Sequence, residues 1–430
     1  MLGNTMLRLL LSLFLAASVL LPASLQAQSI DELQKAAKAN RRSIEAQRAY
    51  GRGLILVGRF DRAERQLTYV SRMLRDSEAG LLLIAEVAVA RGSYRDARKA
   101  CRAIEKESND GLYSRVCRAR AYLVWNRAGR AFEELEAALS DDPKHFEVLL
   151  TLGDAHRLRG ATADAESAYR RAIAADSQRH EPHRGLGFLY VFMGKNPEAI
   201  AAFEKATAMQ PLDTEALLAL AQLLPQERAL PLLQKVVVLR DDWAKAQLAL
   251  GDALASRGEV AAARKAYGRA LKLDPNLAGA HTGLGQLHAQ KGEVQQALAE
   301  FEKALKLVPN DGAAMLAIGE LHEGQNNHLE AYQAYDRAAA MAPNDPRSLL
   351  RAAALALKEK RPMTARAYLE RLRRNPLHAN LAALYSLYGD ILLSHNDRLG
   401  ALEMYEKALK GKGDLDRARV EAAIQSLRNR

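Results

Sequence analysis

The pattern of small, apolar and aromatic positions along this chain repeats with a period of about 34 residues. A Leu-Gly or Ile-Gly pair marks the period, and an alanine, an aromatic residue and a second alanine follow at constant distances; after Gly153 they are Ala165, Tyr169 and Ala172. The marking glycines are Gly153, Gly187, Gly251, Gly285 and Gly319, and proline closes most periods, at Pro211, Pro275, Pro309 and Pro343. A period of this length predicts stacked copies of one small unit that cannot bury its apolar face alone.

Each unit is expected to be a pair of antiparallel helices. The small residue lets the two helices approach closely, and the aromatic residue fills the space between one unit and the next. A glycine recurs where the first helix should end, at positions 58, 92, 160, 194, 258 and 292, and would serve there as a C-cap. Ala, Leu, Arg, Glu and Lys dominate the composition, which also favours helix.

The phase of the repeat places about eleven units along the chain. They are expected to begin at Ile44, Glu78, Leu112, Phe146, His180, Thr214, Ala244, Ala278, Gly312, Pro346 and Ala382. Residues 28–43 form an N-terminal capping helix, opened by a capping box of Ser29 and Glu32, and residues 414–430 form a C-terminal capping helix.

One unit breaks the period, because residues 214–243 are four fewer than the repeat requires. Pro225 should end its first helix early, and Pro231 can occupy the first turn of the second. This shortened unit separates a sub-array over residues 44–213 from another over residues 244–413. It is either a tolerated deletion in a turn or a bend between the two sub-arrays.

These positions resemble the tetratricopeptide repeat family: the small residue of the first helix, the alanine and aromatic residue of the second, and the closing proline. The resemblance covers nearly all of the chain after position 27. It implies an all-α solenoid of helical hairpins wound as a right-handed superhelix, whose first helices line a concave groove that binds other proteins. The function it implies is that of a non-enzymatic interaction scaffold.

The groove positions of the family, carried over by phase, give the candidate partner-binding residues. They are Arg48, Arg52, Arg120, Arg184, Phe188, Phe192 and Gln222. Family members that clamp a C-terminal carboxylate place Lys and Asn here in successive units, and this chain does not. Phe188 and Phe192 beside Arg184 have the composition of a binding hot spot; alternatively, they pack under a neighbouring helix.

No catalytic, cofactor or metal motif survives inspection. Gly185-x-Gly187 and Gly283-x-Gly285 look like the start of a phosphate loop, but the repeat explains both, no strand precedes them and no third glycine follows. His281, His288 and His322 occupy positions that carry packing residues in the family, and His180 with His183 flanks a unit start. We therefore expect neither enzymatic activity, nor a cofactor, nor a metal site.

Residues 1–27 have the organisation of a secretory signal peptide. Arg8 precedes an apolar run from Leu9 to Leu21, and small residues lead to Ala27. The expected product is an exported, periplasmic protein cut after Ala27; the alternative is an uncleaved segment that anchors it to the membrane. In an oxidising compartment the two cysteines, Cys101 and Cys117, could form a disulfide, or they could be small packing residues.

The formal net charge is +11, with both signs interspersed along most of the chain. Residues 347–374 are the exception, with nine Lys or Arg and two acidic residues, and Arg371, Arg373 and Arg374 form a basic patch at its end. The patch could bind an acidic polysaccharide or an anionic membrane surface, or simply complement a helix C-terminus. No aromatic platform accompanies it, so nucleic acid is not expected as a partner. We expect a protein partner, in an envelope assembly such as polysaccharide export, pilus or secretion machinery, with polyanion binding as the alternative.

Overall fold

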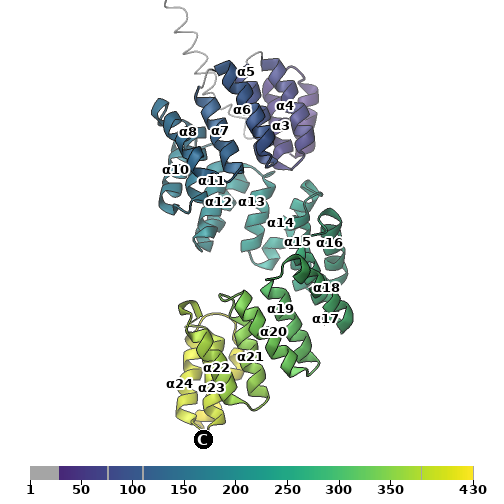
Figure 1. Cartoon of the computed structure of the whole chain (residues 1–430), viewed down its shortest axis with the longest axis vertical. Helices are drawn as coiled ribbons and strands as arrows, with labels where there is room; N and C mark the ends of the chain where they lie inside the picture. Colours follow the sequence, from purple (N-terminus) through teal and green to yellow (C-terminus); the bar gives the residue numbers. More distant parts are fainter. Residues whose placement is uncertain (1–28, 75–76, 109–110, 379, 430) are drawn as a thin grey trace, which may run out of the picture. The chain divides into compact units, whose positions relative to one another are not determined.

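The computed structural model describes residues 29–74, 77–108, 111–378 and 380–429. The described residues are built of α-helices arranged as successive antiparallel pairs (Figure 1), without a β-strand. They divide into two compact units. Unit 1 ends at Ala249 and unit 2 begins at Leu250. None of the helices that the structure describes is long and apolar enough to cross a membrane. The expected signal peptide lies outside the described residues.

Unit 1 begins with one capping helix and continues as helix pairs whose first members start at the phase of the repeat. Its helices are α2 (Ile30–Ala39), α3 (Ile44–Leu56), α4 (Phe60–Leu74), α5 (Ser77–Ala90), α6 (Tyr94–Ser108), α7 (Leu112–Val124), α8 (Ala128–Asp141), α9 (Phe146–Leu158), α10 (Thr162–Ala175), α11 (Glu181–Phe192), α12 (Asn196–Met209), α13 (Thr214–Leu223) and α14 (Gln226–Leu239). Helix α15 (Ala244–Ser256) starts in this unit.

Unit 2 continues the same pattern and ends in a single helix. Its helices are α16 (Val260–Leu273), α17 (Ala278–Gln290), α18 (Val294–Leu307), α19 (Gly312–Gly324), α20 (His328–Met341), α21 (Arg347–Lys358), α22 (Pro362–Arg373), the short 3-10 turn η2 (Pro376–His378), α23 (Ala382–Ser394), α24 (Arg398–Lys410) and α25 (Arg417–Arg428). The all-α solenoid that the sequence predicts is therefore present in both units.

The aromatic position of the repeat is filled as the spacing predicts, by a ring held between two glycines. Tyr169 of α10 is fully buried, and a Cβ atom on Gly153 of α9 or on Gly185 of α11 would lie 2.5 Å from its ring. Tyr267 occupies the same place between Gly251 and Gly283 in unit 2. Glycine is required at both positions because the ring occupies the space that a side chain would need. By filling this space, the ring packs each helix pair against the first helix of the next unit.

The turn between the two helices of a unit contains one residue with positive φ. The six glycines expected at this turn all have φ between 70° and 76°. Where glycine is missing, Asn126, Asn326, Lys360 and Asn396 adopt φ values of 54° to 61°. Asparagine tolerates this left-handed conformation better than most residues, so the turn keeps its geometry even where the glycine pattern lapses.

The shortened unit lies within unit 1. Helix α13 has ten residues, and Pro225 is the N-cap of α14, which confirms that the first helix ends early. The expectation for Pro231 was wrong: it lies inside α14 rather than in its first turn. The reason is that α14 begins directly after Pro225, so the deletion shortens the first helix and the turn and leaves Pro231 beyond the first turn.

Both ends of the array are covered by single helices. The capping box of Ser29 and Glu32 is present: Glu32 N donates to Ser29 Oγ, and Ser29 N donates to Glu32 Oε2. The helix it opens ends at Ala39, and Leu33 and Ala37 are buried against α3. At the other end α25 buries Val420 and Ile424 against the last helix pair.

Unit 1 also has contacts between residues far apart in the sequence. Thr214 Oγ1 donates to the carbonyl oxygen of Leu56 at 2.7 Å, across 158 positions. Arg59, in the turn after α3, pairs with Asp241 and lies 3.7 Å from Asp242. Leu212 and Leu239 pack into the apolar core of α2, α3 and α4. The first helix pair is therefore held by the sixth, and we call these contacts the closing contacts.

Candidate partner-binding face

The first helices of unit 1 carry a series of ion pairs that runs from one helix to the next. On α3, Arg52 makes a two-pronged contact with Glu86 of α5, with Nε to Oε2 at 3.2 Å and Nη2 to Oε1 at 2.9 Å. On α7, Arg120 pairs with Glu147 of α9 and donates from Nε to Thr151 Oγ1 at 3.1 Å. Arginine suits these sites because its planar guanidinium matches a carboxylate with two parallel hydrogen bonds.

Arg179 extends the series to the next unit. Its Nη1 donates to Glu147 Oε1 at 3.2 Å and its Nη2 to Glu181 Oε1 at 2.6 Å. The guanidinium also lies 4.3 Å from the centre of the Phe146 ring. One arginine therefore joins a carboxylate of α9 to one of α11, with an aromatic face beneath it.

The series ends on α13, at the unit that is shortened. Arg184 of α11 donates to Asp213 Oδ2 at 3.2 Å and lies 3.6 Å from Glu215. His180 Nε2 lies 3.3 Å from the same Asp213 oxygen. Asp213 is 1% exposed and caps α13 by accepting from Ala216 N at 3.1 Å. We call the ion-paired residues of this face, from Arg52 to Asp213, the charged row.

Three acids of the charged row, Glu147, Glu181 and Asp213, are held in their ionised form. Burial alone would raise the pKa of Glu147, but Arg120 and Arg179 outweigh it and lower this pKa to about 2. Burial likewise acts to raise the pKa of Asp213, and Arg184 and His180 bring it down to about 2. The pKa of Glu181 falls well below its ordinary value, since His180 and Arg179 again outweigh burial. At neutral pH these three acids are therefore ionised, and each lies beside at least one arginine.

Arg48 is the exception on this face. It lies on α3 one turn before Arg52 and is half-buried, and among the described residues it forms no ion pair and no side-chain hydrogen bond. Burial and the positive charge of Arg52 lower its pKa, and the charges of Glu86 and Glu45 offset this only in part. A guanidinium that is partly desolvated and faces other cations is stabilised by any added anion.

Sequence profiles decide the family. A profile described as tetratricopeptide repeat matches residues 51–111, 118–180, 185–232 and 282–346, which together are more than half of the chain, and one described as TPR repeat matches residues 251–292. The chain belongs to the tetratricopeptide repeat (TPR) family. TPR proteins are protein–protein interaction scaffolds, and this chain has their architecture.

Comparison with known proteins finds similarity at low sequence identity. The BBSome complex member BBS4 of Bos taurus is 22% identical over 250 residues, which are 57% of this chain and 48% of that protein, so the chain spans about half the length of the curated relative it matches. The structure of yeast Tom70 has a TM-score of 0.51 at 13% identity, over 90% of this chain and 97% of that one. YrrB, described as a TPR protein with an unusual peptide-binding site, has a TM-score of 0.37 at 24% identity, over 42% of this chain and 95% of that one. At these identities the likeness concerns the fold.

The other groove positions of this TPR protein differ in their surroundings. Phe188 is half-buried and packs edge-on against Phe203, with 5.1 Å between the ring centres. Phe192, at the end of α11, is 66% exposed, and Gln222 is exposed near the end of α13. Of the two aromatic residues, therefore, Phe192 is free to contact a partner, while Phe188 serves the packing of α11 on α12.

The basic patch on α22 of unit 2 is largely balanced by nearby acids. Arg371 donates to Asp336 at 2.6 Å, and Arg373 donates to Glu370 at 2.9 Å. Only Arg374 of the three has no acidic partner among the described residues. The charge count of the sequence therefore overstates the free positive charge at this site.

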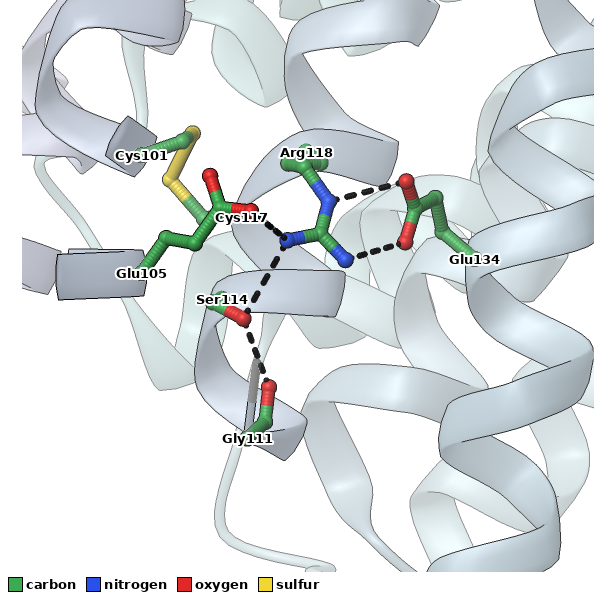
Figure 2. Close-up of a disulfide and its surroundings, with 7 residues drawn as sticks. All are labelled: Cys101, Glu105, Gly111, Ser114, Cys117, Arg118 and Glu134. Carbon is green, nitrogen blue, oxygen red and sulfur yellow. Dashed lines mark hydrogen bonds and ion pairs between the residues drawn. A yellow bond between two sulfur atoms is a disulfide. The ribbon is translucent and has the colours of Figure 1, made fainter. Parts of the chain in front are cut away.

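Cys101 and Cys117 form a disulfide in the structure, which joins α6 to α7 (Figure 2). Both residues are buried. Beside Cys117, Arg118 donates to both carboxylate oxygens of Glu134 on α8, at 2.8 and 2.7 Å. The disulfide and this ion pair thus connect three consecutive helices of unit 1.

Sequence reasoning missed the acidic half of the charged row. Glu147, Glu181 and Glu215 stand at the second place of three successive units, so their regular spacing could have revealed them. Arg179 and Asp213 precede their units by one residue and lie outside the groove positions of the family. The described residues contain no cluster of three or more His, Cys, Asp or Glu side chains that could hold a metal ion.

Proposed function

We propose that this TPR protein is an exported, non-enzymatic scaffold of the bacterial envelope. It binds an extended segment of a partner protein along the first helices of unit 1, and the segment places an acidic group against Arg48. The observation that carries the proposal is the contrast on this face: the arginines of the charged row have carboxylate partners, and Arg48 has none among the described residues. A carboxylate of the partner would complete the pattern that the protein itself follows.

Export is supported by the disulfide and by the composition of the segment from position 1 to position 27. Disulfides form and persist in the periplasm and outside the cell, and they are rare in the cytosol. Cys101 and Cys117 are bonded, and they are the only two cysteines in the chain. Fractionation of cells, with the N-terminal residue of the protein identified by mass spectrometry, tests this part. A product that begins at Gln28 in the periplasm is expected, and a cytosolic product that retains Met1 would refute export.

The partner is tested by cross-linking and capture in the native envelope, with washes at low and at high salt. Wild type is compared with Arg48→Glu and with a control, Arg102→Glu, which makes the same charge change at an exposed position of α6. We expect one protein to be retained by wild type and by the control at both salt concentrations, and to be lost from Arg48→Glu. Salt screens a half-buried ion pair less than an exposed one. The high-salt wash therefore distinguishes a partner bound through Arg48 from one bound through exposed charges.

The same experiment decides between the protein partner and a polyanion. Retention of acidic polysaccharide at low salt alone, without an enriched protein, would overturn the scaffold in favour of polyanion binding. Phe192→Ala adds a second probe, because this exposed ring makes no contribution to the buried core. Loss of capture in Phe192→Ala with an unchanged thermal midpoint would extend the binding face to the end of α11.

A further inference from the structure

A separate pocket lies between the capping helix α2 and the first helix pair, α3 and α4. Its volume is about 460 Å³. This is within the range of about 300–1,000 Å³ typical of small-molecule sites. Buried Ala37 and Leu54 contribute apolar surface to the pocket, and polar side chains of all three helices supply the rest. The pocket is independent of the face proposed above for a partner protein.

The charge of this pocket has one sign. Four cations line it, Lys38, Arg41, Arg62 and Arg65, and its lining contains no Asp or Glu. Among the described residues none of the four forms an ion pair. Four cations that share one pocket thus face it without an acid of its lining beside them. We call this site the basic pocket.

The two acids that neighbour the pocket arginines on α4, and one acid of α2, are held elsewhere. Asp61 and Glu64 alternate with Arg62 and Arg65 on α4, but both accept hydrogen bonds from Arg91 of α5, at 2.9 and 3.1 Å. Helix periodicity explains this arrangement, because residues one position apart face different sides of a helix. On α2, Glu32 is occupied by the capping box. The positive charge of the basic pocket is therefore not neutralised by the described residues of this unit.

The polar groups behind the cations are fixed by hydrogen bonds. Gln47 is buried, donates to the carbonyl oxygen of Ala37 at 2.6 Å and accepts from Gln66 Nε2 at 2.6 Å. Arg62 Nη2 donates to the hydroxyl of buried Tyr50 at 2.8 Å. The Tyr50 hydroxyl accepts this bond, so its own proton is available to a ligand. The floor of the pocket is thus held in place by hydrogen bonds, and long cationic side chains surround it.

We propose that the basic pocket binds a phosphate monoester carried on a body of about sugar size. A phosphate monoester has close to two negative charges at neutral pH and three acceptor oxygens, which match several guanidinium and ammonium donors and the Tyr50 hydroxyl. A bare phosphate ion would fill only a small part of the volume. Tyr69, 46% exposed at the edge of the pocket, and the side-chain amides offer an aromatic face and hydrogen bonds for sugar hydroxyls.

The test is isothermal titration of the full chain with four probes: inorganic phosphate, glucose 6-phosphate, glucose, and vesicles of phosphatidylcholine with or without phosphatidic acid. Glucose 6-phosphate should bind more tightly than inorganic phosphate, and glucose should not bind. Binding of phosphatidic acid vesicles in place of glucose 6-phosphate would support the same phosphate chemistry with a lipid as its source.

Two exposed positions, Arg62 and Arg65, provide the decisive variant. Arg62→Gln/Arg65→Gln should weaken the bound probe at least about tenfold, since two charge-assisted hydrogen-bond donors are lost. The control, Arg95→Gln/Lys99→Gln on exposed positions of α6, makes the same change in net charge away from the pocket and should alter affinity less than about twofold. If the first variant does not fold, Lys38→Gln/Arg41→Gln replaces it. Equal losses in pocket variant and control, or no binding of any phosphate probe by wild type, would overturn the proposal.

Discussion

The buried carboxylate of Asp213 offers the sharpest test of the charged row. Asp213→Asn keeps the size of the side chain and its ability to cap α13, because asparagine is as good an N-cap as aspartate. What it removes is the negative charge that faces Arg184 and His180. The pKa of Asp213 falls from 3.8 in the unfolded chain to about 2 in the folded one. This difference corresponds to about 2–3 kcal/mol of stability at neutral pH.

Fluorescence during urea unfolding isolates the effect, since the only two tryptophans of the chain, Trp125 and Trp243, both belong to unit 1. At pH 7 the Asn variant should lose about 2–3 kcal/mol relative to wild type. A carboxylate with a lowered pKa stabilises the fold above its unfolded pKa and ceases to do so as the pH falls through its folded pKa. The deficit should therefore be about halved at pH 3 and nearly absent at pH 2.

The matched control is Asp311→Asn, which changes the same N-cap position of α19 in unit 2. Asp311 caps Ala313 and Ala314 and has no cationic partner among the described residues. Its replacement, followed by far-UV circular dichroism, should cost less than about 1 kcal/mol. Equal stability of wild type and Asp213→Asn at pH 7, or a deficit that is unchanged at pH 3, would refute the electrostatic reasoning.

Two further predictions concern the packing of unit 1. Replacing Cys101 and Cys117 by serine should destabilise the unit by about 3 kcal/mol, because the bond links residues at a sequence separation of 16; the Trp fluorescence transition measures this, and an unshifted midpoint would contradict it. Gly153→Ala should cost about 1–3 kcal/mol, since its Cβ would lie 2.5 Å from the ring of Tyr169. Gly129→Ala, where no atom lies within 4 Å, should instead stabilise α8 by up to about 1 kcal/mol. Thermal denaturation compares the two glycine variants, and effects of the same sign would show that the ring contact does not govern the first.

The repeat could be predicted from the sequence because its positions contact one another within a unit and at the boundary with the next unit. Gly153 and Tyr169 must fit each other, and every copy of the unit repeats that constraint at the same spacing. Two local features differ from the repeat pattern because they depend on backbone conformation and on where a helix starts. Asn126 replaces glycine in a turn that still requires positive φ, and Pro231 falls inside a helix that starts earlier than the spacing suggests.

The site was predicted less completely than the fold. Arg48, Arg52, Arg120 and Arg184 were all placed on the first helices by phase, but sequence alone could not show which of them are neutralised. That depends on where long side chains meet across different helices, as Arg179 does with Glu147 across 32 positions. The same reason applies to the basic patch. Its formal charge can be counted from the sequence, but the ion pairs that neutralise it cannot be predicted.

The closing contacts change how unit 1 can come apart. In a linear array the terminal repeat touches one neighbour, so it can fray without disturbing the rest. Here the hydrogen bond of Thr214 to Leu56 and the ion pair of Arg59 give the first repeat a second neighbour. Unfolding of the first repeat would expose its contact surfaces with two neighbours rather than one. This higher cost suppresses fraying and makes the six repeats of unit 1 unfold together. Forming those contacts requires closure of a loop that spans 158 positions of the sequence, so they should be made last in folding.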